Sequence, residues 1–226
     1  MRRPILLAIS ILCLALAPSI SARSHRHRAA GNSSSQPGQF DYYVLSLSWS
    51  PQYCAAAASG DPTQCGGRPF AFVVHGLWPQ YNAGGWPQNC GGQQDVDPAI
   101  VNKMLAIMPS PRLVTHEWDT HGACSGLGQQ DYFNTIQRAF GEVKIPAAYS
   151  DPQDYVMVAP TDLKQQFRAA NPSIPPDGIS LMCSGRYLSE VRICVDKNLS
   201  ARSCGPDMRD RCSVDKAVLR PVRGGQ

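Results

Sequence analysis

The segment Pro69–His75 reads PFAFVVH and is apolar almost without interruption. A short apolar run of this kind is typical of a strand buried on both faces, so we predict a central strand here. A second strand is predicted before it, because Phe40–Trp49 reads FDYYVLSLSW, with partial alternation of apolar and polar residues and Pro51 just beyond its end. These two segments predict a fold organised around a β-sheet.

The remaining segments mix helical and extended patterns in irregular order. Helices are predicted at 97–108, 111–122, 131–140 and 161–170, and strands at 178–183 and 190–195. The last two strands are expected to be antiparallel across a turn near Gly185, and residues 75–96, rich in Gly, Pro and Asn, are expected to form a long loop. Because strands and helices do not alternate regularly, the pattern favours an α+β fold over a doubly wound sheet.

The first 39 residues differ from the rest of the chain. Met1–Ala22 has two arginines, then an apolar run from Ile5 to Ala17, then small residues, which is the order of a secretory signal peptide. Arg23–Gln39 lacks apolar periodicity and predicts a disordered basic tail. We therefore expect one globular domain at 40–226, in a protein exported to the periplasm or the extracellular space and free of membrane contact once mature.

The formal net charge of +4 comes from that N-terminal region. Five of the 21 Lys and Arg residues precede Phe40, whereas all 17 Asp and Glu residues follow it, so the body carries 16 basic and 17 acidic residues, a net charge of −1. This balance excludes a broadly basic binding surface on the body. Any nucleic acid must therefore be handled at a local site.

The cysteine count agrees with export. Of nine cysteines, Cys13 lies in the predicted signal peptide, and the remaining eight are an even number that predicts disulfides. No two of them are spaced as C-x-x-C, which disfavours zinc and redox functions. Short separation in sequence favours the pairs Cys54 with Cys65 and Cys194 with Cys204. The cysteines whose pairing this leaves open are Cys90, Cys124, Cys183 and Cys212.

The three histidines of the body lie in two short segments. His75 ends the predicted central strand, and His116 and His121 bracket HEWDTH in one predicted helix. A zinc-protease motif needs histidines at i and i+4, but these are at i and i+5, about 140° apart, so that function is disfavoured. Glu117 and His121 are at i and i+4, where a carboxylate would raise the pKa of the imidazole.

Two histidines and one carboxylate, without a serine-nucleophile motif or a metal cluster, point to general acid–base catalysis without a cofactor. RNA suits such a site because its 2′-OH is an internal nucleophile that needs only deprotonation. An ion pair on an amphipathic helix would also explain the spacing of Glu117 and His121. It would not explain the third histidine in an equally unusual strand-end motif.

Two segments carry a resemblance to a known family. FVVHGLWPQY (72–81) and HEWDTHGAC (116–124) resemble the two signature segments of the ribonuclease T2 family. FDYYVLSLSWSPQYC (40–54) is similar to the first strand of that family, and MCSGRYLSEVRICVDKNLSARSC (182–204) to the C-terminal region of its bacterial-type members. The resemblance covers the chain from Phe40 to about Cys212.

This resemblance implies an α+β fold in which a mostly antiparallel central sheet is flanked by helices and cross-linked by disulfides. It also implies a metal-independent endoribonuclease that cleaves single-stranded RNA with broad base tolerance. We expect DNA to be left intact because it lacks the 2′-OH, and we expect the protein to be a monomer. The product is a 2′,3′-cyclic phosphate, hydrolysed more slowly to a 3′-phosphate. The implied disulfide pairs are Cys54–Cys65, Cys90–Cys124, Cys183–Cys212 and Cys194–Cys204.

The resemblance also implies roles for individual residues. His75 matches the general acid, His121 the base that activates the 2′-OH, and Glu117 the acidic residue that assists at the phosphate. His116 matches a phosphate-binding histidine, and Trp78 an aromatic residue near a base pocket. Further substrate-binding candidates are Tyr81, Trp86 and Thr120.

Thr120 departs from the family pattern, which usually has a lysine directly before the second catalytic histidine. A lysine there stabilises charge that builds on the phosphate, and a threonine carries no charge. Turnover is then lower, or an arginine such as Arg186 or Arg192 supplies the charge. The alternative function is that of a catalytically impaired relative acting as an RNA-binding or toxin-like protein.

Overall fold

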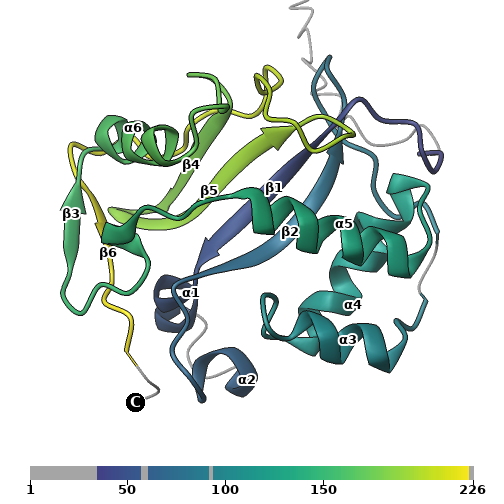
Figure 1. The fold of residues 1–226 in the computed structure, drawn as a ribbon, viewed down its shortest axis with the longest axis horizontal. Helices are drawn as coiled ribbons and strands as arrows, with labels where there is room; N and C mark the ends of the chain where they lie inside the picture. The colour runs from purple at the N-terminus through teal and green to yellow at the C-terminus, as the bar shows by residue number, and fades with distance from the viewer. Residues whose placement is uncertain (1–34, 57–60, 92–93, 224–226) are drawn as a thin grey trace, which may run out of the picture. The chain divides into compact units, whose positions relative to one another are not determined.

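The structure is a computed structural model that describes residues 35–56, 61–91 and 94–223 (Figure 1). The predicted signal peptide and the predicted tail up to residue 34 lie outside the described residues. Residues 35–39, also assigned to the tail, are described, and Gly38 N donates a hydrogen bond to Cys124 O at 2.9 Å. In the described part of the chain, no helix is long and apolar enough to cross a membrane.

One six-stranded sheet lies at the centre of the part of the domain that the structure describes. The strands are β1 (Tyr42–Trp49), β2 (Phe72–Gln80), β3 (Val156–Val158), β4 (Ile179–Ser184), β5 (Tyr187–Val195) and β6 (Ala217–Leu219). Their order is β2-β1-β5-β6-β3, and β4 also pairs with β5. The pairs are antiparallel except for β5 with β6. The mostly antiparallel sheet and the α+β class are therefore confirmed.

Six helices and two 3₁₀ turns are found in the described residues. They are α1 (Ser50–Ala56), α2 (Pro62–Cys65), α3 (Pro98–Met104), α4 (Pro111–Thr120), α5 (Gln129–Glu142) and α6 (Pro160–Ala170), with 3₁₀ turns η1 (Gly122–Ser125) and η2 (Ala147–Tyr149). The main core joins both layers, because buried strand residues such as Leu45 and Ile193 cluster with Ile136 of α5 and Phe167 of α6. All four predicted helices exist, but the first two end earlier than predicted, at Met104 and Thr120.

The alternation seen in the sequence of β1 divides its two faces. Leu45, Leu47 and Trp49 are fully buried in the main core. Tyr42 and Val44 face the other side, where they form a smaller apolar cluster with Cys194. Because side chains of a strand alternate between its faces, Ser46 and Ser48 lie on this second side too. That side of the sheet carries the candidate site.

The second strand is longer than predicted. β2 does not stop at His75 but continues to Gln80, which pairs with Tyr42 at the far end of β1. The predicted loop at 75–96 is therefore wrong for its first residues. Pro79 does not interrupt the pairing, because β2 is at the edge of the sheet and an edge strand tolerates a residue without an N–H group.

Four disulfides close loops around the sheet, and both pairs favoured by sequence separation are among them. The bonds are Cys54–Cys65, Cys90–Cys124, Cys183–Cys212 and Cys194–Cys204, as the family resemblance implies.

Candidate active site

A β-bulge places His75 at the site. Ser46 of β1 pairs with Gly76 and Leu47 pairs with Val74, so His75 is the extra residue on β2. A bulge bends the strand locally and redirects the side chain of the extra residue. The imidazole of His75 is one-third exposed, with 33% of its side chain accessible. His75 is thus an interior bulge residue and not the end of a strand, which corrects the sequence-based expectation.

Small side chains on β1 let His75 reach across that strand to β5. Glu190 of β5 pairs with Ser48, and Arg192 pairs with Ser46. The Nδ1 atom of His75 lies 2.7 Å from Glu190 Oε1. The other carboxylate oxygen of Glu190 is 2.6 Å from Arg192 Nη2, so Glu190 connects the imidazole to a guanidinium.

Glu117 approaches His75 from α4. Its side chain is 1% exposed, and its Oε1 lies 3.7 Å from His75 Nε2. Its other oxygen accepts a hydrogen bond of 2.7 Å from Trp78 Nε1. Gly76 leaves the room for this contact, because a Cβ at that position would overlap Glu117 Oε2 and Trp78 Nε1. The Gly in the HGLWP segment is therefore required by packing.

His121 lies just beyond the end of α4. It is the C-cap residue, with φ at −123°, so its side chain leaves the helical face that carries Glu117. The prediction that Glu117 and His121 form a side-by-side pair on one helix is therefore wrong, and Glu117 contacts His75 instead. The ring of His121 lies 5.4 Å from the ring of Trp78, and its buried Nδ1 has no hydrogen-bond partner among the residues described.

The surroundings shift the pKa values of the two histidines in opposite directions. Burial alone would lower the pKa of His75, but the hydrogen bond to Glu190 and the charges of Glu117 and Glu190 raise it above 6.5. Burial lowers the pKa of His121 to about 3, helped by the positive charges of His116 and His75. Over the mildly acidic range, His75 is protonated and His121 is neutral.

The two carboxylates also differ. Burial raises the pKa of Glu117 to about 7, although the charge of His75 and the hydrogen bond from Trp78 act in the opposite direction. Burial also acts to raise the pKa of Glu190, but the hydrogen bond and charge of His75, together with Arg192, bring it down to about 2. Glu190 is therefore a permanent anion against the Nδ1 side of His75.

Beside these groups, a cleft of about 420 Å³ opens on the second face of the sheet. Its lining includes His121 and three of the predicted substrate-binding residues, Trp78, Trp86 and Thr120. His116 is an exposed residue of α4, and its Nδ1 lies 3.4 Å from the Thr120 hydroxyl. Tyr81 is not in this lining, because its ring packs against the main core.

The structure distinguishes the two arginines considered from the sequence. Arg192 lines the cleft, and its guanidinium carbon lies 4.9 Å from the centre of the Trp78 ring. Arg186 lies away from the cleft, with its Nη2 3.9 Å from the sulfur of Met157. Arg192 is thus the arginine placed near Thr120 and His121.

Glu190 was not among the residues predicted from the sequence. The signal was present, because YLSEVRICV (187–195) alternates apolar residues with Glu190 and Arg192, so the strand places both charges on one face. Only the pairing of β5 with β1 shows that this face meets His75. No group of three or more His, Cys, Asp or Glu residues in the described ranges is placed to hold a metal ion.

Two imidazoles with opposed pKa shifts, next to a cleft, are characteristic of an enzyme that uses general acid–base catalysis. The ribonuclease T2 family model matches residues 40–204. The chain belongs to the ribonuclease T2 family and is an endoribonuclease.

Individual relatives agree. A ribonuclease of Aeromonas hydrophila is 34% identical over 224 residues, covering 95% of this chain and 98% of the relative. Ribonuclease DdI of Dictyostelium discoideum is 31% identical, over 78% of this chain and 82% of its own. The crystal structure of RNase NT in complex with 5′-AMP superposes with a TM-score of 0.61 at 25% identity, over 80% of this chain and 98% of that one. Trichomaglin shares the fold, with a TM-score of 0.66 at 20% identity over 82% of this chain and 100% of its own.

Proposed function

We propose that His121 is the general base and His75 the general acid of RNA cleavage in this chain. A neutral ring nitrogen of His121 takes the proton of the 2′-OH, and the 2′-oxygen attacks phosphorus. As the new P–O2′ bond forms, the P–O5′ bond breaks and protonated His75 gives its proton to the 5′-oxygen. The products are a 2′,3′-cyclic phosphate and a free 5′-OH.

The opposed pKa shifts of the two histidines carry this assignment. A base must be unprotonated and an acid protonated at the same pH, and the lowered pKa of His121 and the raised pKa of His75 meet both conditions. Since the Nδ1 side of His75 faces Glu190, Nε2 is the nitrogen left to meet the substrate. In the slower second stage the roles reverse, and water replaces the departed 5′-oxygen.

The neighbouring residues fit supporting roles. Glu117 lies beside His75 Nε2, where its carboxyl group can hold or release a proton as charge develops on the phosphate. His116 lies next to Thr120, which lines the cleft, and from there both side chains can contact a phosphate oxygen. The rings of Trp78 and Trp86 in the cleft offer stacking surfaces for a base. A base held by stacking is held through a π-face that every base has, which supports broad base tolerance.

We also propose that the protein is an exported monomer. Four disulfides favour an oxidising compartment, and a relative at 32% identity carries the name extracellular ribonuclease LE. Residues 1–22 have the residue order of a secretory signal peptide. Size-exclusion chromatography with light scattering, and sequencing of the N-terminus of protein recovered from the periplasm or medium, test both parts.

One incubation tests the reaction. The purified protein is mixed with RNA, or with single-stranded DNA of the same sequence, in excess EDTA. RNA is expected to be cut to fragments ending in 2′,3′-cyclic phosphate, and DNA to stay intact because it lacks the 2′-OH. Activity lost on chelation, or equal cleavage of DNA, contradicts the proposal. RNA binding without any cleavage would instead support the catalytically impaired alternative.

A further inference from the structure

Part of the cleft lining comes from a segment beyond the residues that the family model matches. The family model ends at residue 204, and Gly205–Cys212 follows it. The residues that this segment contributes to the lining are Asp207, Met208, Arg209 and Arg211. Two arginines of the cleft lining therefore come from a stretch of chain beyond the residues that the family model matches.

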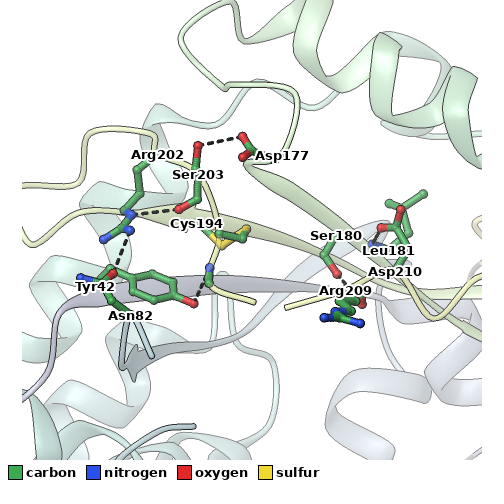
Figure 2. The surroundings of a disulfide bond; sticks show 12 residues. Tyr42, Asn82, Asp177, Ser180, Leu181, Cys194, Arg202, Ser203, Arg209 and Asp210 are labelled. Carbon is green, nitrogen blue, oxygen red and sulfur yellow. Dashed lines mark hydrogen bonds between the residues drawn. A yellow bond between two sulfur atoms is a disulfide. The ribbon is translucent and has the colours of Figure 1, made fainter. Parts of the chain in front are cut away.

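This segment is held firmly against the sheet (Figure 2). At one end, Gly205 N donates to the hydroxyl of Tyr42 at 3.0 Å. Further along, Ser180 Oγ donates to Arg209 O at 3.0 Å, and Leu181 N donates to Asp210 Oδ1 at 2.9 Å. The disulfides Cys194–Cys204 and Cys183–Cys212 close both ends. The backbone beneath Arg209 and Arg211 is thus fixed before any ligand arrives.

The charges of Arg209 and Arg211 are not neutralised locally. Neither has an ion pair among the residues the structure describes. Of the two nearby acids, Asp210 pairs with Lys164 at 3.0 Å. Asp207, which also lines the cleft, accepts a hydrogen bond from Gly85 N at 2.7 Å and keeps its negative charge. Arg192, the third arginine of the lining, is committed to Glu190. Arg209 Nε donates to the backbone oxygen of Pro206 at 2.7 Å. Arg209 and Arg211 are therefore two exposed cations of the cleft lining that have no carboxylate partner among the described residues.

We propose that Arg209 and Arg211 form a subsite for a backbone phosphate of RNA other than the phosphate that is cleaved. The cleaved phosphate must lie near His75 and His121, and the cleft of about 420 Å³ next to His121 has room for the adjoining nucleotide. The next phosphate along the chain then meets the wall that carries Arg209 and Arg211. Guanidinium groups suit this task because they donate paired hydrogen bonds to phosphate oxygens. The subsite rests on the proposed function, since it serves the same RNA strand.

This subsite also explains how a body with no net positive charge engages a polyanion. Residues 40–226 carry 16 basic and 17 acidic residues, so attraction over the whole surface is absent. Two arginines without an ion pair in the cleft lining concentrate positive charge beside the proposed path of the RNA strand. Longer substrates gain this interaction, and a substrate with a single phosphate does not.

The test compares the double variant Arg209→Gln/Arg211→Gln with the parent on two substrates in EDTA: a dinucleoside monophosphate and an oligoribonucleotide of about ten residues. The loss of kcat/KM on the oligonucleotide is expected to exceed the loss on the dinucleoside monophosphate on the order of tenfold, since hydrogen bonds to charged groups are at stake. The dependence of log kcat/KM on log salt is also expected to become shallower, by about 0.7 for each phosphate of a single strand that the variant no longer binds.

A matched control removes two positive charges elsewhere. Arg138 on α5 and Arg186 lie outside the cleft lining, and Arg138→Gln/Arg186→Gln is expected to leave the ratio between the two substrates unchanged. The proposal is refuted if Arg209→Gln/Arg211→Gln loses the same factor in kcat/KM on both substrates. It is also refuted if the control variant shows the same change in salt dependence as that double variant. A parent enzyme that cleaves neither substrate would instead overturn the proposed catalytic assignment, so the two failures are distinguishable. Adding a 5′- or a 3′-phosphate to the dinucleoside monophosphate then identifies the side on which the subsite lies.

Discussion

The imidazole of His75 and the carboxylate of Glu190 meet across β1, with Nδ1 and Oε1 2.7 Å apart. An anion against Nδ1 fixes the proton on that nitrogen and orients the ring, so that Nε2 is directed away from Glu190. Arg192 holds the second oxygen of Glu190 and also lies over the ring of Trp78. We interpret Glu190 as a positioning residue that acts on the substrate through His75.

Glu190→Gln is expected to move the alkaline limb of the pH–rate profile to lower pH. The amide keeps a hydrogen bond to Nδ1 but removes the negative charge that raises the pKa of His75. His75 acts as an acid only while protonated, so a lower pKa means that activity is lost at a lower pH. Glu117 and Arg192 also face His75 and are unchanged in the variant. The measurement is kcat/KM against pH on a dinucleoside monophosphate.

The control for that experiment is Glu142→Gln, at the C-terminal end of α5 and outside the site. It removes the same charge and is expected to leave the alkaline limb in place. A merely structural role for Glu190 would lower activity equally at all pH values. A profile with the parent's alkaline limb would therefore refute the positioning role.

His75→Ala and His121→Ala are each expected to lower kcat by roughly 10² to 10⁴, the usual contribution of a positioned acid or base. Single-turnover cleavage of a dinucleoside monophosphate measures this directly, and circular dichroism checks that each variant is folded. His121→Ala is also expected to remove the acidic limb, because that limb reports protonation of the base. A folded variant that keeps more than about a tenth of the parental rate does not have the assigned role.

Gly76→Ala is expected to lower both stability and activity. The added Cβ would overlap Glu117 Oε2 and Trp78 Nε1, so the hydrogen bond between them must give way. Overpacking of this kind costs about 1–3 kcal/mol of unfolding free energy. Gly141→Ala is the control, because no heavy atom lies within 4 Å of a Cβ there in α5, and alanine stabilises a helix by up to about 1 kcal/mol. Urea titration measures both, and equal stability of the two variants would refute the packing argument.

The sequence predicted the elements better than their ends. The apolar run at 69–75 predicted β2, and the alternating segment at 40–49 predicted β1. Because Gly and Pro follow His75, the sequence indicated a loop there, whereas β2 continues to Gln80. That continuation depends on pairing with β1, which local composition does not encode. The same limit applies to His75, since a bulge is defined by the register of two strands and not by either one alone.

The site was predicted in its residue types but not in all its contacts. The helical spacing of Glu117 and His121 suggested a pair, but the helix ends at Thr120 and Glu117 turns to His75. Glu190 comes from a strand 115 residues after His75, so only the folded sheet brings the two together. Contacts of this length depend on topology, and no local pattern reveals them.

Thr120→Lys is expected to raise kcat about threefold to tenfold. Thr120 lines the cleft with His121, and its hydroxyl lies 3.4 Å from His116 Nδ1, so a lysine there places a cation at the proposed phosphate position. Negative charge grows on the phosphate oxygens in the transition state, and a cation that helps the transition state more than the ground state raises kcat. A new positive charge beside His121 also lowers the pKa of that base further, so the acidic limb moves to lower pH.

Thr120→Gln is the matched control, because it lengthens the side chain without adding charge, and it is expected to give neither effect. The measurement is kcat against pH on a dinucleoside monophosphate for the parent and both variants. Equal gains for Lys and Gln would show that side-chain length matters and charge does not. An unchanged or lower kcat in folded Thr120→Lys would mean that a cation already serves the phosphate. Arg192 is then the residue to replace next, since it lines the same cleft.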